Sequence, residues 1–452
     1  MKSSANFLWL SFVPFSKFDL WDTKRYTSKQ FESSFPIVRL GECIREENKK
    51  YKLSTQPEKE FGILGVSNKV GIFDAYLQKG KEINQSYKKM KIGWIAYNPY
   101  RINVGSIGVR KSEHLFEYIS PAYVVFSCKE NLLPEFLFLL FRTETFNKVI
   151  NENTTGSVRQ NLTVEILKNL EIPLPTLDEQ RKIVDAYERK INEAKTLELN
   201  AENLESEIER YLFEELGVQL AQKSNNHKGL QFINFTDIER WDILFLMGQV
   251  DQIGSKYKIK KFAKVITSFN KGQDGKSLRI DSSKFPQSDF RYIGMEHIEK
   301  KTGTLLELQN VKGGEIKSQT INVPRNFMIY GKLRPYLNKY WVNNTGFDNI
   351  ICSSEFFVFD IDEEKLDKSF FKYVLASEII QSQINDKTSG ARMPRINEEI
   401  FFNLHFPMPD IQEQLKISQK ISSMKTEIEL NKEKAKNLRV SAEEEFEKTI
   451  FQ

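Results

Sequence analysis

Two long segments of the chain carry an apolar residue at almost every third or fourth position. One stripe runs from Val184 to Tyr211, and the other runs from Ile417 to Phe446. This spacing places the apolar side chains on one face of an α-helix and predicts two helices of roughly 35–40 residues, about 55–60 Å long. A stripe this narrow is typical of a helix that packs against a single partner helix. The alternative is that each helix packs on its own globular domain.

Shorter runs with β-type residues precede each striped segment. They are interrupted by Gly, Asn and Pro, which is typical of short strands joined by turns. In each half a short helix is predicted next, around residues 134–149 and 367–384. A Pro-x-Pro element follows, which cannot be helical at its prolines. The runs that predict strands cover residues 92–97, 123–126, 327–330 and 356–359.

The two striped segments belong to an internal repeat. The sequence Ile172-Pro-Leu-Pro-Thr-Leu-Asp-Glu-Gln returns as Phe406-Pro-Met-Pro-Asp-Ile-Gln-Glu-Gln, an offset of 234 residues. The same offset maps Gly156 onto Gly390. Landmarks that keep their order across two halves indicate that a whole unit of domain and helix was duplicated.

The predicted fold class is α+β, with two globular domains that are each followed by a long α-helix. Because the duplication supplies a partner helix, we expect the two helices to form an antiparallel coiled-coil spacer with an internal pseudo-two-fold. The expected boundaries are a globular domain at 1–170, a central helical region at 171–216, a linker at 217–229, a second globular domain at 230–405 and a C-terminal helical region at 406–452.

The charge of the chain is unevenly distributed. The net charge is +5, yet residues 171–216 hold 13 acidic and 6 basic residues (net −7), and residues 410–452 hold 9 and 8 (net −1). The remaining parts therefore carry +13. Positive charge confined to the globular parts is what contact with phosphates requires, although ordinary lysine-rich surfaces also produce it.

Other features of the composition exclude several classes of protein. Cys43, Cys128 and Cys352 show no paired spacing, which argues against a disulfide framework and indicates a reducing, cytoplasmic compartment. The four histidines are scattered, so we expect no metal site. No stretch approaches the ~18 consecutive apolar residues of a membrane helix, so no membrane contact is expected.

Three motifs resemble one known family. Gly156-Ser-Val-Arg-Gln-Asn-Leu-Thr, followed by the Pro-x-Pro element and a long charged helix, resembles the specificity subunit of type I restriction–modification enzymes. Gly390-Ala-Arg-Met-Pro-Arg-Ile-Asn looks like the second target-recognition unit of that family, and Tyr97-Asn-Pro-Tyr-Arg-Ile-Asn-Val-Gly is similar to its first-unit loop. The second half departs from this pattern, because only Lys332-Leu-Arg-Pro-Tyr-Leu-Asn-Lys stands opposite the first-unit loop.

The resemblance covers nearly the whole chain and implies a function. A specificity subunit recognises an asymmetric bipartite DNA target through two recognition domains held apart by a helical ruler. It binds two methyltransferase subunits, which carry S-adenosylmethionine, and optionally two motor-nuclease (restriction) subunits. The chain itself would then be non-catalytic and would bind no cofactor, and the methyltransferase would flip an adenine out of the duplex.

The candidate DNA-binding residues are basic or aromatic side chains in loop-like stretches. Arg and Asn can read guanine and adenine edges, whereas Lys mostly contacts phosphate. Each of them could instead cap a strand or face solvent. The candidates are Lys69, Arg101, Asn103, Arg110, Arg159, Lys271, Lys276, Arg279, Lys332, Arg334, Tyr336, Lys339, Arg392 and Arg395.

Four residues at the starts of the two long helices are candidate contacts for partner subunits. They are Glu179, Gln180, Glu413 and Gln414. A carboxylate in the first turn of a helix is also favoured by the helix dipole, so the recurrence of the two glutamates has a structural explanation as well.

Two other functions fit parts of the sequence. A coiled-coil scaffold for protein interactions would use the helices without binding DNA sequence-specifically. A self-contained methyltransferase or nuclease is disfavoured, because Asn98-Pro-Tyr lacks the second proline of an adenine methyltransferase motif. Phe61-Gly-Ile-Leu-Gly also has the wrong spacing for a loop that holds S-adenosylmethionine.

Overall fold

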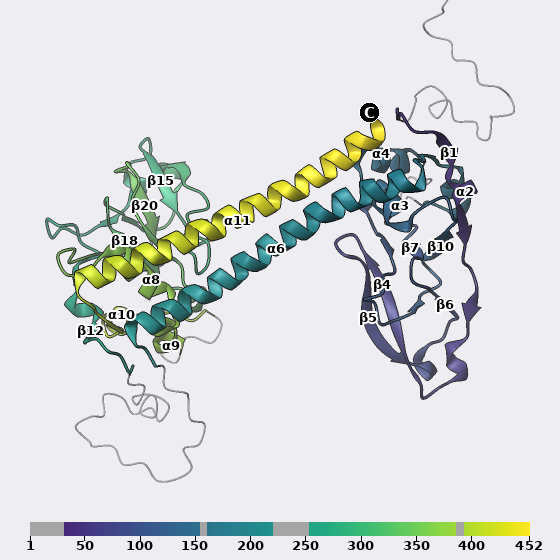
Figure 1. Cartoon of the computed structure of the whole chain (residues 1–452). Helices are drawn as coiled ribbons and strands as arrows, with labels where there is room; N and C mark the ends of the chain where they lie inside the picture. Colours follow the sequence, from purple (N-terminus) through teal and green to yellow (C-terminus); the bar gives the residue numbers. More distant parts are fainter. Residues whose placement is uncertain (1–30, 154–160, 220–252, 386–392) are drawn as a thin grey trace, which may run out of the picture. The chain divides into compact units, whose positions relative to one another are not determined.

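A computed structural model describes residues 31–153, 161–219, 253–385 and 393–452 (Figure 1). The chain divides into two compact units. Unit 1 contains Met1–Glu198 and Lys432–Gln452, and unit 2 contains Leu199–Asn431. Most of the expected linker and the start of the expected second globular domain, residues 220–252, lie outside the described residues.

The two predicted long helices are confirmed. Helix α6 spans Leu177–Leu216 with 40 residues, and helix α11 spans Ile411–Phe451 with 41 residues. Unit 1 contains the first part of α6 and the last part of α11, whereas unit 2 contains the last part of α6 and the first part of α11. Helices of this length agree with the uninterrupted apolar stripes and with the absence of proline inside them.

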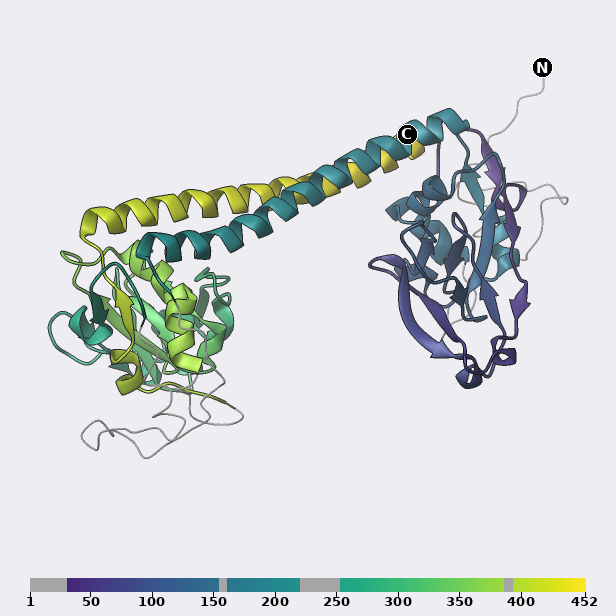
Figure 2. The same cartoon turned by 60° about the horizontal axis from the view of Figure 1, so that its bottom comes forward.

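The described residues in the globular part of unit 1 form three sheets (Figure 2). A four-stranded sheet has the order β2-β10-β7-β8, a five-stranded sheet has the order β3-β6-β9-β4-β5, and β1 pairs with β11. All pairs are antiparallel except β4 with β9. The strands are β1 Ile37–Arg39, β2 Ile44–Glu46, β3 Lys50–Tyr51, β4 Glu60–Ser67, β5 Gly71–Lys79, β6 Tyr87–Lys89, β7 Ile95–Tyr97, β8 Ile107–Val109, β9 Tyr118–Ile119, β10 Val124–Cys128 and β11 Glu171–Pro173.

Unit 2 repeats these sheets strand for strand. The orders are β13-β21-β18-β19, β14-β17-β20-β15-β16 and β12-β22, and β15 with β20 is again the parallel pair. The strands are β12 Ile259–Lys261, β13 Ile266–Phe269, β14 Arg279–Ile280, β15 Asp289–Ile293, β16 Gln309–Lys312, β17 Thr320–Asn322, β18 Met328–Gly331, β19 Tyr340–Val342, β20 Ile350–Ser353, β21 Phe356–Ile361 and β22 His405–Pro407. The duplication inferred from the sequence is therefore a duplication of topology.

Short helices complete each globular part. In place of each predicted single helix there are two, separated at Thr143 in unit 1 and at Ser377 in unit 2. Each of these hydroxyls donates to a carbonyl of the preceding helix, which ends that helix and lets a second one start. The α-helices are α2 Leu40–Cys43, α3 Pro134–Leu140, α4 Glu144–Asn153, α5 Val164–Asn169, α8 Lys368–Ala376, α9 Glu378–Asn385 and α10 Glu398–Phe402; the 3₁₀ helices are η2 Leu53–Thr55, η3 Gly80–Glu82, η4 Ile102–Val104, η6 Phe262–Lys264, η7 Ser282–Lys284, η8 Met295–His297, η9 Gly313–Glu315 and η10 Pro335–Leu337.

In each unit the two long helices pack together and also enter the globular core. In unit 1, Val184 of α6 and Phe446 and Ile450 of α11 belong to the same core as the short helices. In unit 2, Leu212 and Leu216 of α6 join a core with the start of α11. Both proposed uses of the apolar stripe are therefore present, because the same stripe contacts the partner helix and the globular domain.

Polar contacts between the two long helices show that they run antiparallel within unit 1. The guanidinium of Arg439 forms two hydrogen bonds to Glu198, at 3.0 and 2.7 Å, and Lys190 pairs with Glu445. The residue numbers rise along one helix as they fall along the other, so the helices run in opposite directions. Because these groups are at least partly exposed, each pair contributes about 0–1 kcal/mol and acts mainly on register.

A buried glutamine lies in the first turn of each long helix. The side-chain oxygen of Gln180 accepts from the N–H of Leu133 at 2.8 Å, and its amide donates to the carbonyls of Asn131 and Pro175 at 3.0 and 2.8 Å. Leu133 is the N-cap residue of helix α3. This one side chain therefore ties the Pro-x-Pro element, the loop before α3 and the long helix together.

Gln414 makes the same three hydrogen bonds in unit 2. Its side-chain oxygen accepts from Asp367 at 2.8 Å, and its amide donates to the carbonyls of Lys365 and Pro409 at 3.0 and 2.9 Å. Both glutamines are 0% exposed. Each hydrogen-bond partner of Gln414 lies 234 residues after the corresponding partner of Gln180. The internal repeat therefore extends to individual hydrogen bonds.

A lysine is partly buried where α11 packs on α8 in unit 2. Lys425 of α11 lies over the ring of Tyr373, and Lys372 of α8, Glu429 and Glu205 are the other charged groups that act on it. Burial is the main cause that lowers the pKa of Lys425 to about 8, and the positive charge of Lys372 adds to the effect.

Replacing Gln414 with alanine should destabilise unit 2 by about 2–4 kcal/mol, because one buried and two part-buried hydrogen bonds to backbone groups are lost. Denaturant unfolding of the full chain measures this loss. The exposed Gln412, two residues earlier on the same helix, is the matched control, and Gln412→Ala should leave the unfolding midpoint within about 0.5 kcal/mol of the wild type. Equal midpoints for the two variants would refute the bridging role of Gln414.

Replacing Lys425 with methionine should stabilise unit 2 at pH 7, and the gain should disappear at high pH. Between about pH 8 and 10.5 the unfolded chain holds a proton on Lys425 that the folded chain has lost, so wild-type stability rises with pH across this window. The variant should therefore exceed the wild type by about 2–3 kcal/mol at pH 7 and by much less above pH 10. Unfolding at both pH values measures the change, with exposed Lys420→Met as the control; a gain that is the same at both pH values would contradict it.

Candidate nucleic-acid interface

Two exposed loops of unit 1 bring several candidate residues together. The first is the turn between β4 and β5, which carries the exposed Lys69. The second is the loop from β7 to β8, in which Arg101 is exposed at the start of η4 and Asn103 is half-buried. The loops are neighbours, because Ser106 Oγ donates to the carbonyl of Val66 at 3.3 Å.

Left-handed backbone shapes the second of these loops. Gly105 ends η4 with a φ of 81°, a conformation that costs glycine nothing and other residues about 1 kcal/mol. The loop also exposes apolar side chains, since Tyr100 and Val104 are 56% and 54% exposed. A surface that mixes exposed basic and apolar side chains suits contact with the backbone and bases of a nucleic acid.

Arg110 is placed differently from the other candidates of unit 1. Its guanidinium donates to the carbonyl of Met90 at 2.8 Å and to that of His114 at 3.4 Å, and its Nε is buried without a partner among the described residues. These hydrogen bonds fix the chain that follows β8. Arg110 therefore has a structural role that the sequence did not indicate.

A basic hairpin in unit 2 carries three further candidates. Lys271 and Lys276 are exposed on either side of a turn that is closed by a hydrogen bond from the Gly272 N–H to the Lys276 carbonyl. Arg279, also exposed, follows on β14. Lys276 pairs with Asp274 at 3.3 Å. Hydrogen bonds from the backbone and side chain of Lys276 hold the pKa of Asp274 below its usual value, so this carboxylate stays charged and reduces the net positive charge of the turn.

The loop from β18 to β19 in unit 2 corresponds to the loop from β7 to β8 in unit 1. Both contain a short 3₁₀ helix, and in both a segment after the second short helix bonds to the loop. Leu162 N–H donates to the carbonyl of Pro99 at 3.0 Å, and Ile396 N–H donates to that of Lys332 at 3.2 Å. The sequences of the two loops differ in length and composition, yet they occupy the same place in the fold.

Lys332 and Arg395 are brought together by one residue, Glu355. Arg395 makes two hydrogen bonds to Glu355, at 3.0 and 3.1 Å, and the backbone N–H of Lys332 donates to the Glu355 carbonyl at 2.8 Å. Burial lowers the pKa of the Lys332 ammonium, and the positive charge of Arg279 adds to this effect, while Glu355 opposes it. Arg279, Lys332 and Arg395 thus form one cluster, although they are distant in sequence.

The remaining candidates of this loop are divided between surface and interior. Arg334 and Tyr336 are exposed, and Arg334 has a left-handed backbone with a φ of 48°. The ammonium of Lys339 donates to the carbonyl of Met295 at 2.5 Å, and burial lowers its pKa. Lys339 therefore holds neighbouring loops together, whereas Arg334 and Tyr336 face outward. Arg159 and Arg392 lie outside the described residues.

The four candidate docking residues take structural positions. Glu179 and Thr176 form a capping box, in which the Glu179 carboxylate accepts from the hydroxyl and the N–H of Thr176 at 2.7 and 2.8 Å. These two hydrogen bonds lower the pKa of Glu179. Glu413 donates its N–H to Asp410 at 3.0 Å and pairs with Lys416. The expectation for Gln180 and Gln414 needs correction, because complete burial prevents their side chains from touching a partner.

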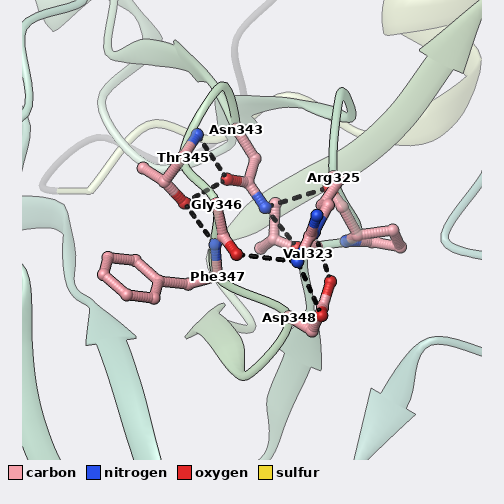
Figure 3. A network of polar contacts seen from close by, with 8 residues as sticks. Val323, Arg325, Asn343, Thr345, Gly346, Phe347 and Asp348 are labelled. Carbon is pink, nitrogen blue, oxygen red and sulfur yellow. Dashed lines mark hydrogen bonds and ion pairs between the residues drawn. The ribbon is translucent and has the colours of Figure 1, made fainter.

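Sequence reasoning overlooked an arginine on the second five-stranded sheet. Arg291 of β15 stacks its guanidinium 3.4 Å from the centre of the Phe347 ring. Phe347 lies in a loop that Figure 3 shows to be held by polar contacts, including the pairing of Arg325 with Asp348 and the hydrogen bond from the Asn343 side chain to the carbonyl of Pro324. In the sequence Arg291 is one basic residue of an ordinary strand, and no motif marks its pairing with a residue 56 positions later.

Within the described residues, no group of three or more His, Cys, Asp or Glu side chains is arranged to hold a metal ion. In that same part of the chain, no helix has the length and apolar character needed to cross a membrane.

Comparisons with known proteins agree with this architecture. The family described as the type I restriction modification DNA specificity domain matches residues 44–210 and 255–439, which is well over half of the chain. The MjaVIII specificity subunit of a type I restriction enzyme from Methanocaldococcus jannaschii is 21% identical over 422 residues, covering 89% of this chain and 88% of that protein. The EcoDI specificity subunit from Escherichia coli is 22% identical over 332 residues, covering 71% and 68%.

A solved structure shows the same fold. It is described as "Structural basis underlying complex assembly and conformational transition of the type I R-M system", and it superposes with a TM-score of 0.56 at 16% identity, covering 93% of this chain and 99% of the other. The family match extends over both duplicated units and most of both long helices. The chain therefore belongs to the family of DNA specificity subunits of type I restriction–modification systems.

Proposed function

We propose that this subunit recognises an asymmetric, bipartite DNA target, with one segment read by each unit. The observation that carries the proposal is that two units of identical strand order present different side chains at the same loop. An exposed arginine precedes the 3₁₀ helix of this loop in both units, Arg101 and Arg334. The neighbouring exposed side chains differ, because unit 1 exposes Tyr100 and Val104 whereas unit 2 exposes Tyr336. Two identical units would favour a palindromic DNA target. Two units with the same fold and different loops therefore favour a target with two different half-sites.

The recognition domains of this proposal are residues 1–170 and 230–405, joined through residues 217–229, with helical regions at 171–216 and 406–452. A helix of 40 residues is about 60 Å long, which is more than the ~34–36 Å helical repeat of B-DNA. The pair of helices would thus fix the number of base pairs between the two half-sites.

Catalysis would belong to the partners of the chain. Two methyltransferase subunits would bring S-adenosylmethionine, and motor-nuclease subunits would join in systems that cleave DNA. The relative described for complex assembly of a type I system supports such partners. Glu179 and Glu413 are the remaining candidate docking side chains, since neither is buried. The three free thiols fit a reducing, cytoplasmic setting.

Binding of duplex DNA by the chain, assembled with methyltransferase subunits, should weaken steeply with salt. The logarithm of the affinity should fall with the logarithm of the salt concentration by about 0.9 per phosphate contacted. Lys69→Ala and Arg101→Ala should each reduce this slope by about one if they contact phosphate. Lys81, which is paired with Glu58 away from the β4–β5 turn, is the control and should leave the slope unchanged. An affinity independent of salt would instead favour the protein-interaction scaffold.

Removing one heptad from each long helix should shorten the gap between the two recognised segments without changing their bases. The deletions lie between Ala194 and Leu204 in α6 and between Asn431 and Leu438 in α11. Each removes about 10.5 Å, or roughly three base-pair steps. Methylome sequencing of cells that carry the variant and the partner subunits measures the gap. A gap of unchanged length would show that the helices do not set it.

A further inference from the structure

The five-stranded sheet of unit 2 has an arginine where the corresponding sheet of unit 1 has a glycine. Gly62 precedes the residue of β4 that lies beside Tyr118 of β9. Arg291 precedes the residue of β15 that lies beside Ile351 of β20. The neighbouring strands of the two sheets continue in the same register, so Gly62 and Arg291 occupy the same position in the duplicated fold.

A phenylalanine covers this position in both units. In unit 1 a Cβ added to Gly62 would come within 2.1 Å of the Phe116 ring, so the ring fills the space and excludes any side chain there. In unit 2 the Phe347 ring lies against the Arg291 guanidinium at 3.4 Å and stays 41% exposed. In unit 1 the phenylalanine ring therefore fills this position, whereas in unit 2 an arginine side chain occupies it and the ring stacks on its guanidinium.

The loop that carries Phe347 is held firmly in place (Figure 3). Asn343 is 0% exposed and donates to the carbonyls of Val323 and Pro324 at 2.8 and 3.1 Å. Arg325 donates to the carbonyl of Gly346 at 2.7 Å and pairs with Asp348. A partly exposed aromatic side chain on such a loop loses little conformational entropy when it meets a ligand.

Arg291 differs from its basic neighbours because they pair with acidic side chains and it does not, among the described residues. Lys312 on the adjacent strand pairs with Asp289 at 2.7 Å, and Arg325 pairs with Asp348. Arg291 has no ion pair among the described residues; one Nη donates to the amide oxygen of Asn310 at 3.2 Å, and its Nε is buried without a partner in the same part of the chain. Its positive charge is therefore not neutralised by the described residues of the unit.

We infer that Arg291, stacked on Phe347, reads a base edge in the DNA segment recognised by unit 2. This inference rests on the proposed function and assigns it a specificity-determining residue. Because Nε is buried, the donors available to a base are those of the two Nη groups. A planar guanidinium fixed on an aromatic ring holds these groups in a rigid fork, which matches the two acceptors of a guanine edge. Unit 1 has no equivalent contact, because Gly62 has no side chain.

The position of Arg291 adds length to the recognition surface of unit 2. Arg291 pairs with Ile350 at the start of β20, whereas Glu355, which bonds Lys332 and Arg395, lies just beyond the end of that strand. The four residues of β20 span about 13 Å, and Glu355 lies in the turn that follows them. This length matches about four base-pair steps of 3.4 Å, so the two groups can contact bases of one short segment.

The test is selection from a pool of duplex DNA with randomised sequence, using the full chain assembled with methyltransferase subunits. Wild type, Arg291→Ala, Arg291→Lys and the control Lys312→Ala are compared. Both Arg291 variants should lose preference at one or two positions of one half-site and bind the wild-type duplex about tenfold to hundredfold more weakly. Arg291→Lys keeps the charge and the aliphatic stem, so it stays informative if the alanine variant folds poorly.

Each outcome has one reading. If the wild type selects no motif, the proposed function fails. If the wild type selects a motif and both Arg291 variants select the same motif with unchanged affinity, only the assignment of Arg291 fails. A loss of equal size on every duplex, restored by lysine, would mean phosphate contact and would overturn base reading. Loss of preference confined to one half-site, with Lys312→Ala like the wild type, supports the inference.

Discussion

A single buried amide in the first turn of each long helix holds three separate pieces of chain in place. Gln180 bonds the Pro-x-Pro element behind it and the loop that starts the short helix α3, and Gln414 does the same for α8. Backbone groups in those loops have no helix or sheet to pair with and cannot be left unsatisfied when buried. The long helix can therefore leave its globular domain in only one direction without losing these hydrogen bonds. Everything proposed about spacing depends on that restriction.

Duplication of this frame gives the two units the same scaffold and leaves their loops free to differ. The three sheets have the same strand order in both units. The loop from β7 to β8 in unit 1 and the loop from β18 to β19 in unit 2 each contain a 3₁₀ helix. On this scaffold Asn338 of unit 2 occupies the position of Gly105 in unit 1, and Arg291 occupies the position of Gly62. A rigid frame with variable loops is the arrangement in which specificity can change while stability is retained.

The candidate site illustrates how far residue type alone can mislead. Arg110 and Lys339 have the composition of DNA contacts, yet both donate to backbone carbonyls inside their units. Lys69, Arg101 and Arg334 are exposed, as expected of residues that meet a ligand. Both groups consist of basic residues in loops rich in Gly and Asn, so the sequence could not separate them. The difference lies in which carbonyl happens to be within reach of each side chain.

Local pattern was enough to determine the long helices, the duplication and the family. The apolar stripes are periodic over the whole of α6 and α11, and the offset of 234 residues later proved to relate individual hydrogen bonds of Gln180 and Gln414. The docking role expected for these glutamines was wrong because a sequence shows that a polar residue recurs but not whether it is buried. The stacking of Arg291 on Phe347, and the glycine that replaces the arginine in unit 1, depend on strand register. Register is set by contacts between residues far apart in the chain, so only the tertiary structure could decide it.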